Sequence, residues 1–438
     1  MPDDPGFELR LTAAYRRYLD DAPEIDAVEL ARSIARAHPR GRRGWWNWPA
    51  FAQLGRVGWL VILVALLLAV LAAILSVGAF RRLPAPDGLA RAGIIAFDTK
   101  GGHIVLTGAD GSDARDISAP TGGDHLPIWS PDGTHLAFWR ATGDFFSIVV
   151  TDPDGTIESA TLTQAPVPPD TASAYAGGAP GPLAWAPDSR HIAFWMYVDG
   201  LPRIHTMSSD GADLHAIGDP RIPAIDPAWS PDGSRIAFAG MGDFFGDQGA
   251  APDSTGLFVM DADGTGVRRI AHVDHALTES DFYAFHEPQW QPGGELIAFQ
   301  ADSDGASMRV LVVRADGTGE RDVSLQVGGH ISDDAWPAWS PDGTLLAFTR
   351  PRTDSASRRS PVVGYQVVVV GADGTEVAVP AHPAVQGASL TWSPDGMRLL
   401  GYSPDQTDVV DIDLSGARPT RVIPVAFDQE ARWQRVAP

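Results

Sequence analysis

Short apolar runs separated by polar turns recur along most of the chain. Residues 129–138 read Trp-Ser-Pro-Asp-Gly-Thr-His-Leu-Ala-Phe, which is an apolar residue, a polar turn and then an apolar run. In the turn, proline fixes one backbone dihedral angle, and aspartate and glycine tolerate those that follow. More or less altered copies of this pattern start at Trp185, Trp229, Trp290, Trp339 and Trp392. Because self-similarity at a fixed period marks a repeat architecture, this unit determines the fold.

Each unit predicts four short strands. The first carries the tryptophan, the second is the Leu/Ile-Ala-Phe run, the third is an apolar run such as 257–260, and the fourth is short, as at 268–270. Asp-Gly turns lie between the third and fourth strands, and this dipeptide is a strong hairpin signal. One of them, 261–264, resembles half of an EF-hand loop. Because no bidentate glutamate closes a twelve-residue loop, we interpret it as a hairpin turn.

Two fragments near the ends of the chain supply one more unit. Residues 94–97, 103–106 and 115–117 have the pattern of second, third and fourth strands, and Trp433 has the pattern of an isolated first strand. Together they would complete one blade and close a ring, which removes exposed sheet edges. The sequence therefore predicts an all-β, seven-bladed β-propeller over 93–438, closed by its N- and C-terminal strands. A six-bladed propeller is the alternative.

The repeated unit from Trp129 to Phe138 resembles the TolB-type repeat, also called the WD40-like or PD40 β-propeller repeat. The resemblance covers nearly all of 93–438; two copies depart from it in the turn, with Asp188-Ser189 and Gly293-Gly294. It implies protein–protein contact of the kind found in bacterial envelopes. Similar repeats also form the gating propeller of prolyl-oligopeptidase-like enzymes, so the fold alone does not decide the function.

A long apolar run precedes the repeats. Residues 57–80 carry no charge, and as a helix they are long enough to cross a hydrocarbon core of about 30 Å. A cleaved signal peptide is the alternative, but the run is too long and lies too far from the N-terminus. Residues 45–56 form a juxtamembrane segment of aromatic and basic residues, and 81–92 form a stalk. The helical spacing of apolar residues in 1–44 predicts a short cytoplasmic segment of two helices.

Basic residues near this run predict its orientation. Arginines are more frequent on its N-terminal side (Arg36, Arg40, Arg42, Arg43 and Arg56) than after it (Arg81, Arg82 and Arg91). By the positive-inside rule the N-terminus is cytoplasmic. The sequence thus predicts a single-pass protein of the cell membrane that contacts the lipid bilayer through 57–80 and carries an extracytoplasmic propeller.

The amino-acid composition excludes some kinds of chemistry and argues against one class of partner. The chain has 438 residues, no cysteine and a net charge of −22. The absence of cysteine excludes disulfides and cysteine-based metal or nucleophile chemistry. The negative charge argues against nucleic acid as a partner, because phosphate binding needs a basic surface. Acidic and basic residues nearly balance in 1–56, so the acidity belongs to the repeats, where we expect a well-solvated surface.

Candidate binding residues lie between the repeated units, since variable loops carry function on a rigid scaffold. The ligand-binding candidates are Asp124, His125, Asp226, His286, Glu287, Phe244 and Phe245. His125 and His286 both stand four residues before a repeated tryptophan, so we expect them at one mouth of the channel. With His272 and His275 they are candidates for a divalent metal site; ordinary solvated loops are the alternative. We also expect a long loop over 349–364 that carries a local basic patch of Arg350, Arg352, Arg358 and Arg359; a disordered, solvated loop is the alternative.

The expected function is binding. No Gly-x-Ser-x-Gly elbow, hydrolase domain or glycine-rich phosphate loop follows the propeller, so we assign no catalytic residue and no cofactor. We expect a binding or sensing module whose layout resembles transmembrane anti-sigma factors, with a cytoplasmic regulator at 1–44; the zinc-type His/Cys motif of that group is absent. The alternatives are an extracytoplasmic enzyme, a metal- or sugar-binding propeller, and an envelope-assembly scaffold that recognises a partner peptide at the channel.

Overall fold

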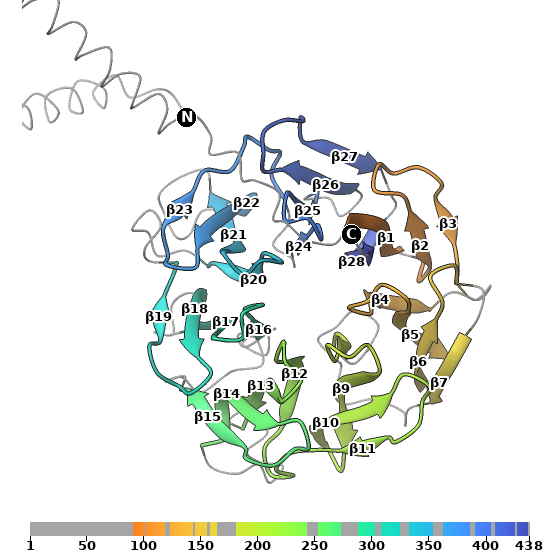
Figure 1. Cartoon of the computed structure of the whole chain (residues 1–438), viewed down its shortest axis with the longest axis vertical. Helices are drawn as coiled ribbons and strands as arrows, with labels where there is room; N and C mark the ends of the chain where they lie inside the picture. Colours follow the sequence, from red (N-terminus) through yellow and green to blue (C-terminus); the bar gives the residue numbers. More distant parts are fainter. Residues whose placement is uncertain are drawn as a thin grey trace, which may run out of the picture. The chain divides into compact units, whose positions relative to one another are not determined.

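The computed structural model describes 91–99, 101–118, 123–142, 145–155, 158–163, 181–242, 253–272, 288–302, 308–324, 333–353, 362–385, 390–403, 408–424 and 427–436. The strands in these residues form seven four-stranded antiparallel sheets, which are arranged in a ring (Figure 1). The predicted seven-bladed β-propeller is therefore confirmed, and the six-bladed alternative is wrong.

We number the blades along the chain. Blade 1 is β28 (Phe427–Val436), β1 (Arg91–Thr99), β2 (Ile104–Thr107) and β3 (Arg115–Asp116). Blade 2 is β4 (Asp124–Trp129), β5 (Leu136–Thr142), β6 (Phe145–Thr151) and β7 (Glu158–Thr163). Blade 3 is β8 (Ala184–Trp185), β9 (His191–Val198), β10 (Leu201–Ser208) and β11 (His215–Ala216). Blade 4 is β12 (Ala224–Trp229), β13 (Arg235–Met241), β14 (Thr255–Asp261) and β15 (Arg268–Ala271). Blade 5 is β16 (Gln289–Trp290), β17 (Leu296–Asp302), β18 (Met308–Arg314) and β19 (Arg321–Asp322). Blade 6 is β20 (Ala335–Trp339), β21 (Leu345–Thr353), β22 (Val362–Gly371) and β23 (Glu376–Val377). Blade 7 is β24 (Thr391–Trp392), β25 (Arg398–Tyr402), β26 (Asp408–Asp413) and β27 (Arg421–Pro424).

Blade 1 closes the ring with strands from opposite ends of the sequence. β28 pairs with β1 in antiparallel register, with Ile95 opposite Trp433 and Phe97 opposite Ala431. The side chain of Gln434 accepts a hydrogen bond from the N–H of Ile94 at 3.2 Å and donates one to the carbonyl of Gly133 in blade 2 at 2.8 Å. The predicted closure is thus present. β1 begins at Arg91, slightly before the predicted start of the propeller at 93.

The core lies within and between the blades. Alternate residues of the second and third strands point to opposite faces of each sheet, so both faces can pack on neighbouring blades. The phenylalanines of the repeated unit are almost fully buried, including Phe138, Phe194, Phe238 and Phe348. One apolar cluster joins Trp139 of blade 2 to Trp185 and Phe194 of blade 3, so apolar burial holds adjacent blades together.

The repeated turn is held by its own side chains. In 230–235, the Ser230 hydroxyl donates to the Asp232 carboxylate at 2.6 Å and accepts the backbone N–H of Arg235 at 2.9 Å. The same bonds recur at Ser130 and Asp132, and at Ser340 and Asp342. The turn at 261–264 is a hairpin between β14 and β15, as predicted.

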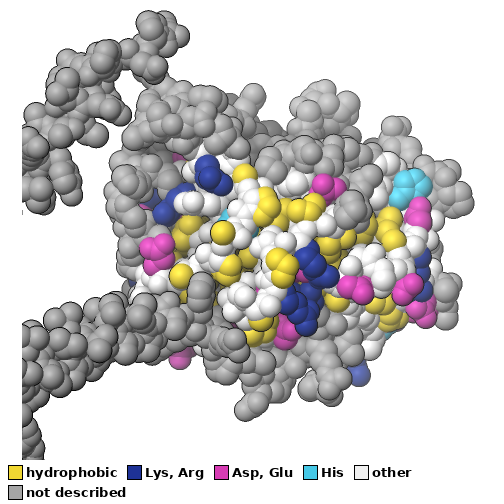
Figure 2. Space-filling model, turned by 90° about the horizontal axis from the view of Figure 1, so that it is seen from above, with side chains coloured by type: hydrophobic (Ala, Val, Ile, Leu, Met, Phe, Trp, Pro, Cys, Tyr) yellow, Lys and Arg dark blue, Asp and Glu magenta, His cyan; other side chains and the backbone are white. Residues whose placement is uncertain are grey.

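The outer rim has a mixed surface. Figure 2 shows acidic, basic and apolar side chains interspersed over the described part of one side of the ring. This is consistent with the expected solvated surface. Within the described residues, no helix is long and apolar enough to span a membrane. The predicted segments 1–44, 45–56 and 57–80 lie outside these residues, as does the stalk up to residue 90.

Candidate functional site

The central channel holds a cavity of about 570 Å³ lined by the innermost strands and the turns that follow them. Most of its lining comes from two repeated positions: the residue before each tryptophan, and the proline two residues after it. The lining residues at these positions are Ile128, Ala184, Ala228, Gln289, Arg432, Pro131, Pro187, Pro231, Pro292 and Pro341, with Trp129, Trp185, Trp229 and Trp290 beside them.

Four of the seven repeated tryptophans donate their indole N–H to the preceding blade, whereas the buried indole N–H groups of Trp129, Trp229 and Trp433 have no hydrogen-bond partner within the described residues. The indole N–H of Trp185 donates to the carbonyl of Ile128 at 3.2 Å, and that of Trp290 to the carbonyl of Ala228 at 3.0 Å. Trp339 and Trp392 make the same bond, to Gln289 at 3.1 Å and Ala338 at 2.9 Å. Each bond ties one inner strand to the preceding blade. It also removes a polar group from the channel surface, so the polar side chains of the wall come from Asp226, Gln289 and Arg432.

Two charged residues line this cavity. Asp226 lies in β12 at a β-bulge, where its φ of 50° places the backbone in the left-handed region. Arg432 of β28 donates from Nη1 to the hydroxyl of Thr391 at 2.9 Å. A side chain at Gly181 would approach the Asp226 carboxylate to 2.8 Å, so glycine permits this close approach. Asp226 is therefore the one sequence-predicted ligand residue that the described part of the chain places in the channel cavity.

Asp124 is buried and bound within its own blade. Its carboxylate accepts from Arg140 Nε at 2.8 Å and from Arg140 Nη2 at 3.1 Å. Blade 6 repeats this pair with Asp334 and Arg350, at 2.9 Å and 2.5 Å. Such a bidentate pair satisfies both charges, so we assign Asp124 a structural role. Arg350 lies in β21 and is 8% exposed, so the prediction that it belongs to a loop is wrong.

His125 lies in β4 opposite Trp139, and its ring Nδ1 is 3.9 Å from the buried carboxylate of Asp98. The exposed His272 follows β15. His275, His286, Glu287, Phe244 and Phe245 lie outside the described residues, so the convergence of His125 with His286 stays a prediction. Within the described ranges, no cluster of three or more histidine and carboxylate side chains could hold a metal ion.

Sequence reasoning missed the channel lining. It assigned the repeated prolines and tryptophans to packing and turns alone, and it looked for the site in the loops between the units. The signal was the repeat itself. An identical position on successive blades must face the same axis, so the residue next to each tryptophan and the turn proline form a ring.

Comparison with known proteins gives partial matches to TolB proteins. The chain is 31% identical over 166 residues to a TolB homolog of Chlorobium luteolum, covering 37% of this chain and 32% of that protein. It is 27% identical over 181 residues to the Tol-Pal system protein TolB of Anaeromyxobacter dehalogenans, and the match covers 40% of this chain and 37% of that protein. The matched region spans only about a third of the length of these relatives.

A longer match to a curated protein and a match to a solved structure are also found. An uncharacterized protein of Agrobacterium fabrum is 25% identical over 283 residues, covering 62% of this chain and 81% of that protein. The crystal structure of TolB from Acinetobacter baumannii aligns with 78% of this chain and 66% of its own, at 13% identity and a TM-score of 0.45. No family model matches the chain.

Proposed function

Because the chain carries a TolB-like β-propeller, we propose that it is a protein-binding module that takes a segment of a partner protein into the proline- and tryptophan-lined end of its channel. The observation that carries this proposal is the cavity of about 570 Å³ whose wall carries tryptophan and proline side chains from successive blades together with a few polar groups. Concave, mostly apolar surfaces with a few polar groups are typical binding sites.

The wall suits an extended peptide with apolar side chains. Tryptophan and proline rings are rigid, so they lose little conformational entropy when a partner packs against them. Asp226 and Arg432 are charged groups in this wall that could orient the polar backbone or a charged side chain of the segment. A role in envelope assembly is one form of this function.

Two alanines in the wall allow a direct test. Ala228 and Ala184 line the cavity, and an arginine at either position places a long charged side chain in it. Ala212 is exposed in the turn between β10 and β11 and serves as the control. We expect Ala228→Arg and Ala184→Arg, but not Ala212→Arg, to lose the partner that co-purifies with the full-length protein. Retention of the same partner by all three folded variants would contradict channel binding.

We propose further that residues 57–80 anchor the protein in the cell membrane, with 1–44 and the juxtamembrane segment 45–56 on the cytoplasmic side, the stalk 81–92 beyond it and the propeller outside. The uncharged length of 57–80 and the arginines before it support this topology. Since the chain has no cysteine, single introduced cysteines report sidedness cleanly. An impermeant maleimide should label Ala212→Cys in intact cells and Ala35→Cys only after lysis. The reverse pattern would overturn the orientation.

The cytoplasmic segment 1–44 is the proposed route for a signal. Its two expected helices are too short to bury a core of their own, which supports a partner such as a cytoplasmic regulator. Immobilised full-length protein should retain a cytoplasmic partner that a chain lacking 1–44 does not retain. If both forms retain the same cytoplasmic proteins, this segment serves for anchoring only.

A further inference from the structure

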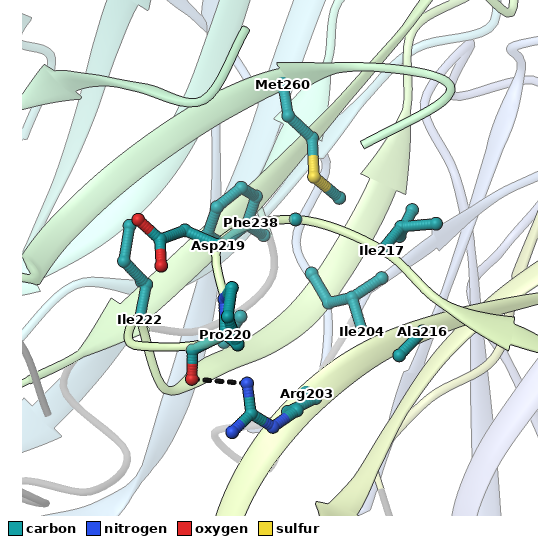
Figure 3. Close-up of a pocket in the computed structure, with 11 residues that line it drawn as sticks. Arg203, Ile204, Ala216, Ile217, Asp219, Pro220, Ile222, Phe238 and Met260 are labelled. Atoms are coloured by element: carbon teal, nitrogen blue, oxygen red, sulfur yellow. Dashed lines mark hydrogen bonds between the residues drawn. The ribbon is translucent and has the colours of Figure 1, made fainter. Parts of the chain in front are cut away.

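A second cavity lies outside the channel, between blades 3 and 4. Its volume is about 260 Å³, and Figure 3 shows the side chains that line it. Its apolar walls come from both blades and from the segment that joins β11 to β12, and they are formed by Ile204, Ile217, Ile222, Ala224, Phe238 and Met260. A cavity of about 150 Å³ with such walls accommodates benzene, so this one has room for an aromatic ring with a short substituent.

The cavity lies at a junction that lacks a contact found elsewhere in the ring. At four other junctions an arginine of the outermost strand donates to a carbonyl in the turn of the next blade, as Arg268 Nη2 does to Ala315 at 2.5 Å. The other three arginines are Arg115, Arg321 and Arg421. In blade 3, His215 stands at this position, and its ring nitrogen contacts the carbonyl of Asp213 in its own blade at 2.6 Å. The outer edge of this junction is therefore built differently.

Arg203 of β10 is the cation that lines the cavity. Its Nη1 donates to the carbonyl of Pro220, as the dashed line in Figure 3 shows. Its Nε is buried and has no hydrogen-bond partner within the described part of the chain. A buried donor without a partner is costly, because it has lost its bonds to water. The guanidinium thus retains donor capacity toward an acceptor.

The charges at this end of the cavity favour an anion. The carboxylate of Asp219 is bound by Arg221, through Nη2 at 2.8 Å and Nε at 3.1 Å. These bonds and the backbone N–H of Arg221 lower the pKa of Asp219, so it is ionised at neutral pH. Arg221 lies outside the cavity lining and pairs with Asp219, so Arg203 is the lining charge that makes no ion pair with a carboxylate of the described residues. An incoming carboxylate can accept two N–H groups from a guanidinium in the usual fork geometry.

We propose that this inter-blade cavity binds a small monocarboxylate with an aromatic or branched apolar body. The body occupies the space between Ile204, Phe238 and Met260, and the carboxylate accepts hydrogen bonds from Arg203. The site is separate from the channel, so it adds a small-molecule ligand to the proposed protein-binding function. Because the ligand bridges two blades, its binding stabilises the folded ring.

The test uses 4-fluorophenylacetate as the probe and the full-length protein in detergent, with binding followed by fluorine NMR. The amide, 4-fluorophenylacetamide, keeps the ring and removes the charge. We expect the acid to bind at least ten-fold more tightly than the amide. Arg203→Met should remove this preference, and Ala216→Phe, at the exposed mouth, should abolish binding of both compounds.

Arg190→Met provides the matched control, because Arg190 is an exposed arginine of the same blade and does not line the cavity. It should bind both compounds as the parent protein does. Unchanged melting temperatures without ligand establish that the variants are folded. The proposal is overturned if the acid does not bind at millimolar concentration, or if folded Arg203→Met and Ala216→Phe bind it as tightly as Arg190→Met.

Discussion

Single aspartates hold the conformation of the repeated turns in this propeller. In the turn that follows Trp229, the Asp232 carboxylate accepts three hydrogen bonds. One comes from the Ser230 hydroxyl, and the other two come from the backbone N–H and the hydroxyl of Ser234, at 3.0 and 2.8 Å. These bonds favour the ionised form and lower the pKa of Asp232 from 3.8 to about 2. The pKa values of Asp132 and Asp342 are also lowered: burial opposes the shift, and the equivalent serine and threonine bonds outweigh it.

This shift predicts acid sensitivity. A carboxyl whose pKa is lower in the folded state stabilises it above the unfolded pKa, and the contribution is lost as pH falls through the folded pKa. The free energy of unfolding should therefore decrease between about pH 4 and about pH 2. Asp232→Asn should cost about 1 kcal/mol at neutral pH and weaken this pH dependence, as measured by urea titration. Asp210→Asn, in an exposed turn of blade 3, should do neither; equal effects of both would contradict the role given to the Ser-x-Asp turn.

Glycines of the outer turns test packing between blades. Gly264 has a φ of 85°, and a Cβ there would lie 2.6 Å from the backbone N of Gly218, in the segment that joins β11 to β12. Gly416 occupies the equivalent turn of blade 7 with a φ of 65° and has open space around it. Gly416→Ala should lower the free energy of unfolding by about 1 kcal/mol because of the backbone conformation alone. Gly264→Ala should lower it by at least about 1 kcal/mol more. Similar shifts in denaturation midpoint would mean that the turn of blade 4 does not pack as described.

At the level of elements, the outermost strand of one blade is linked to the turn of the next. The arginine contacts at Arg115, Arg268, Arg321 and Arg421 come from strands that read Arg-x-Ile or Arg-x-Val, and they reach carbonyls in turns that end in Asp-Gly. The apolar residue of the strand packs on the turn glycine, as Ile270 does near Gly317. These contacts supplement the tryptophan bonds around the channel.

The contribution of the arginine contact to the free energy of unfolding can be measured. Arg268→Met removes a charged donor from a partly buried carbonyl and should lower the free energy of unfolding by about 1.5–3 kcal/mol. Its neighbour Arg269 bonds the carbonyl of Asp253 within blade 4 at an exposed position. Arg269→Met should cost less than about 1 kcal/mol. Denaturant titrations of both variants, compared at equal m-values, check the prediction; equal losses would show that the contact between blades adds nothing.

The architecture could be predicted from the sequence because each copy of the repeat contains residues that mark its own strands and turns. The turn residues and apolar runs around Trp129 and its copies mark each strand, and the fragments at 94–97 and Trp433 reveal the shared blade. Pairing between distant residues was not predictable in this way. The partner of Asp124 is Arg140, which becomes adjacent only when β4 pairs with β5, and Arg350 is buried because Asp334 lies opposite it. The arginine contacts between blades were missed for the same reason.

At the scale of the whole molecule, the ring provides two different kinds of surface. The channel wall comes mostly from two repeated positions, the residue before each tryptophan and the proline of the turn that follows it. The cavity between blades 3 and 4 arises where the repeat departs from its pattern, with His215 in place of arginine. Regular positions therefore build the proposed protein site, and an irregular position builds the proposed small-molecule site.

The most direct test of the channel as a protein-binding site is site-specific photo-crosslinking in cells. A photoreactive phenylalanine analogue at Gln289 lies in the channel wall, and the same analogue at Ala212 lies on an exposed outer turn. We expect full-length protein carrying the analogue at Gln289 to form one discrete adduct with a partner, and the Ala212 protein not to form it. Adducts from Ala212 without any from Gln289, or identical adducts from both positions, would contradict the account.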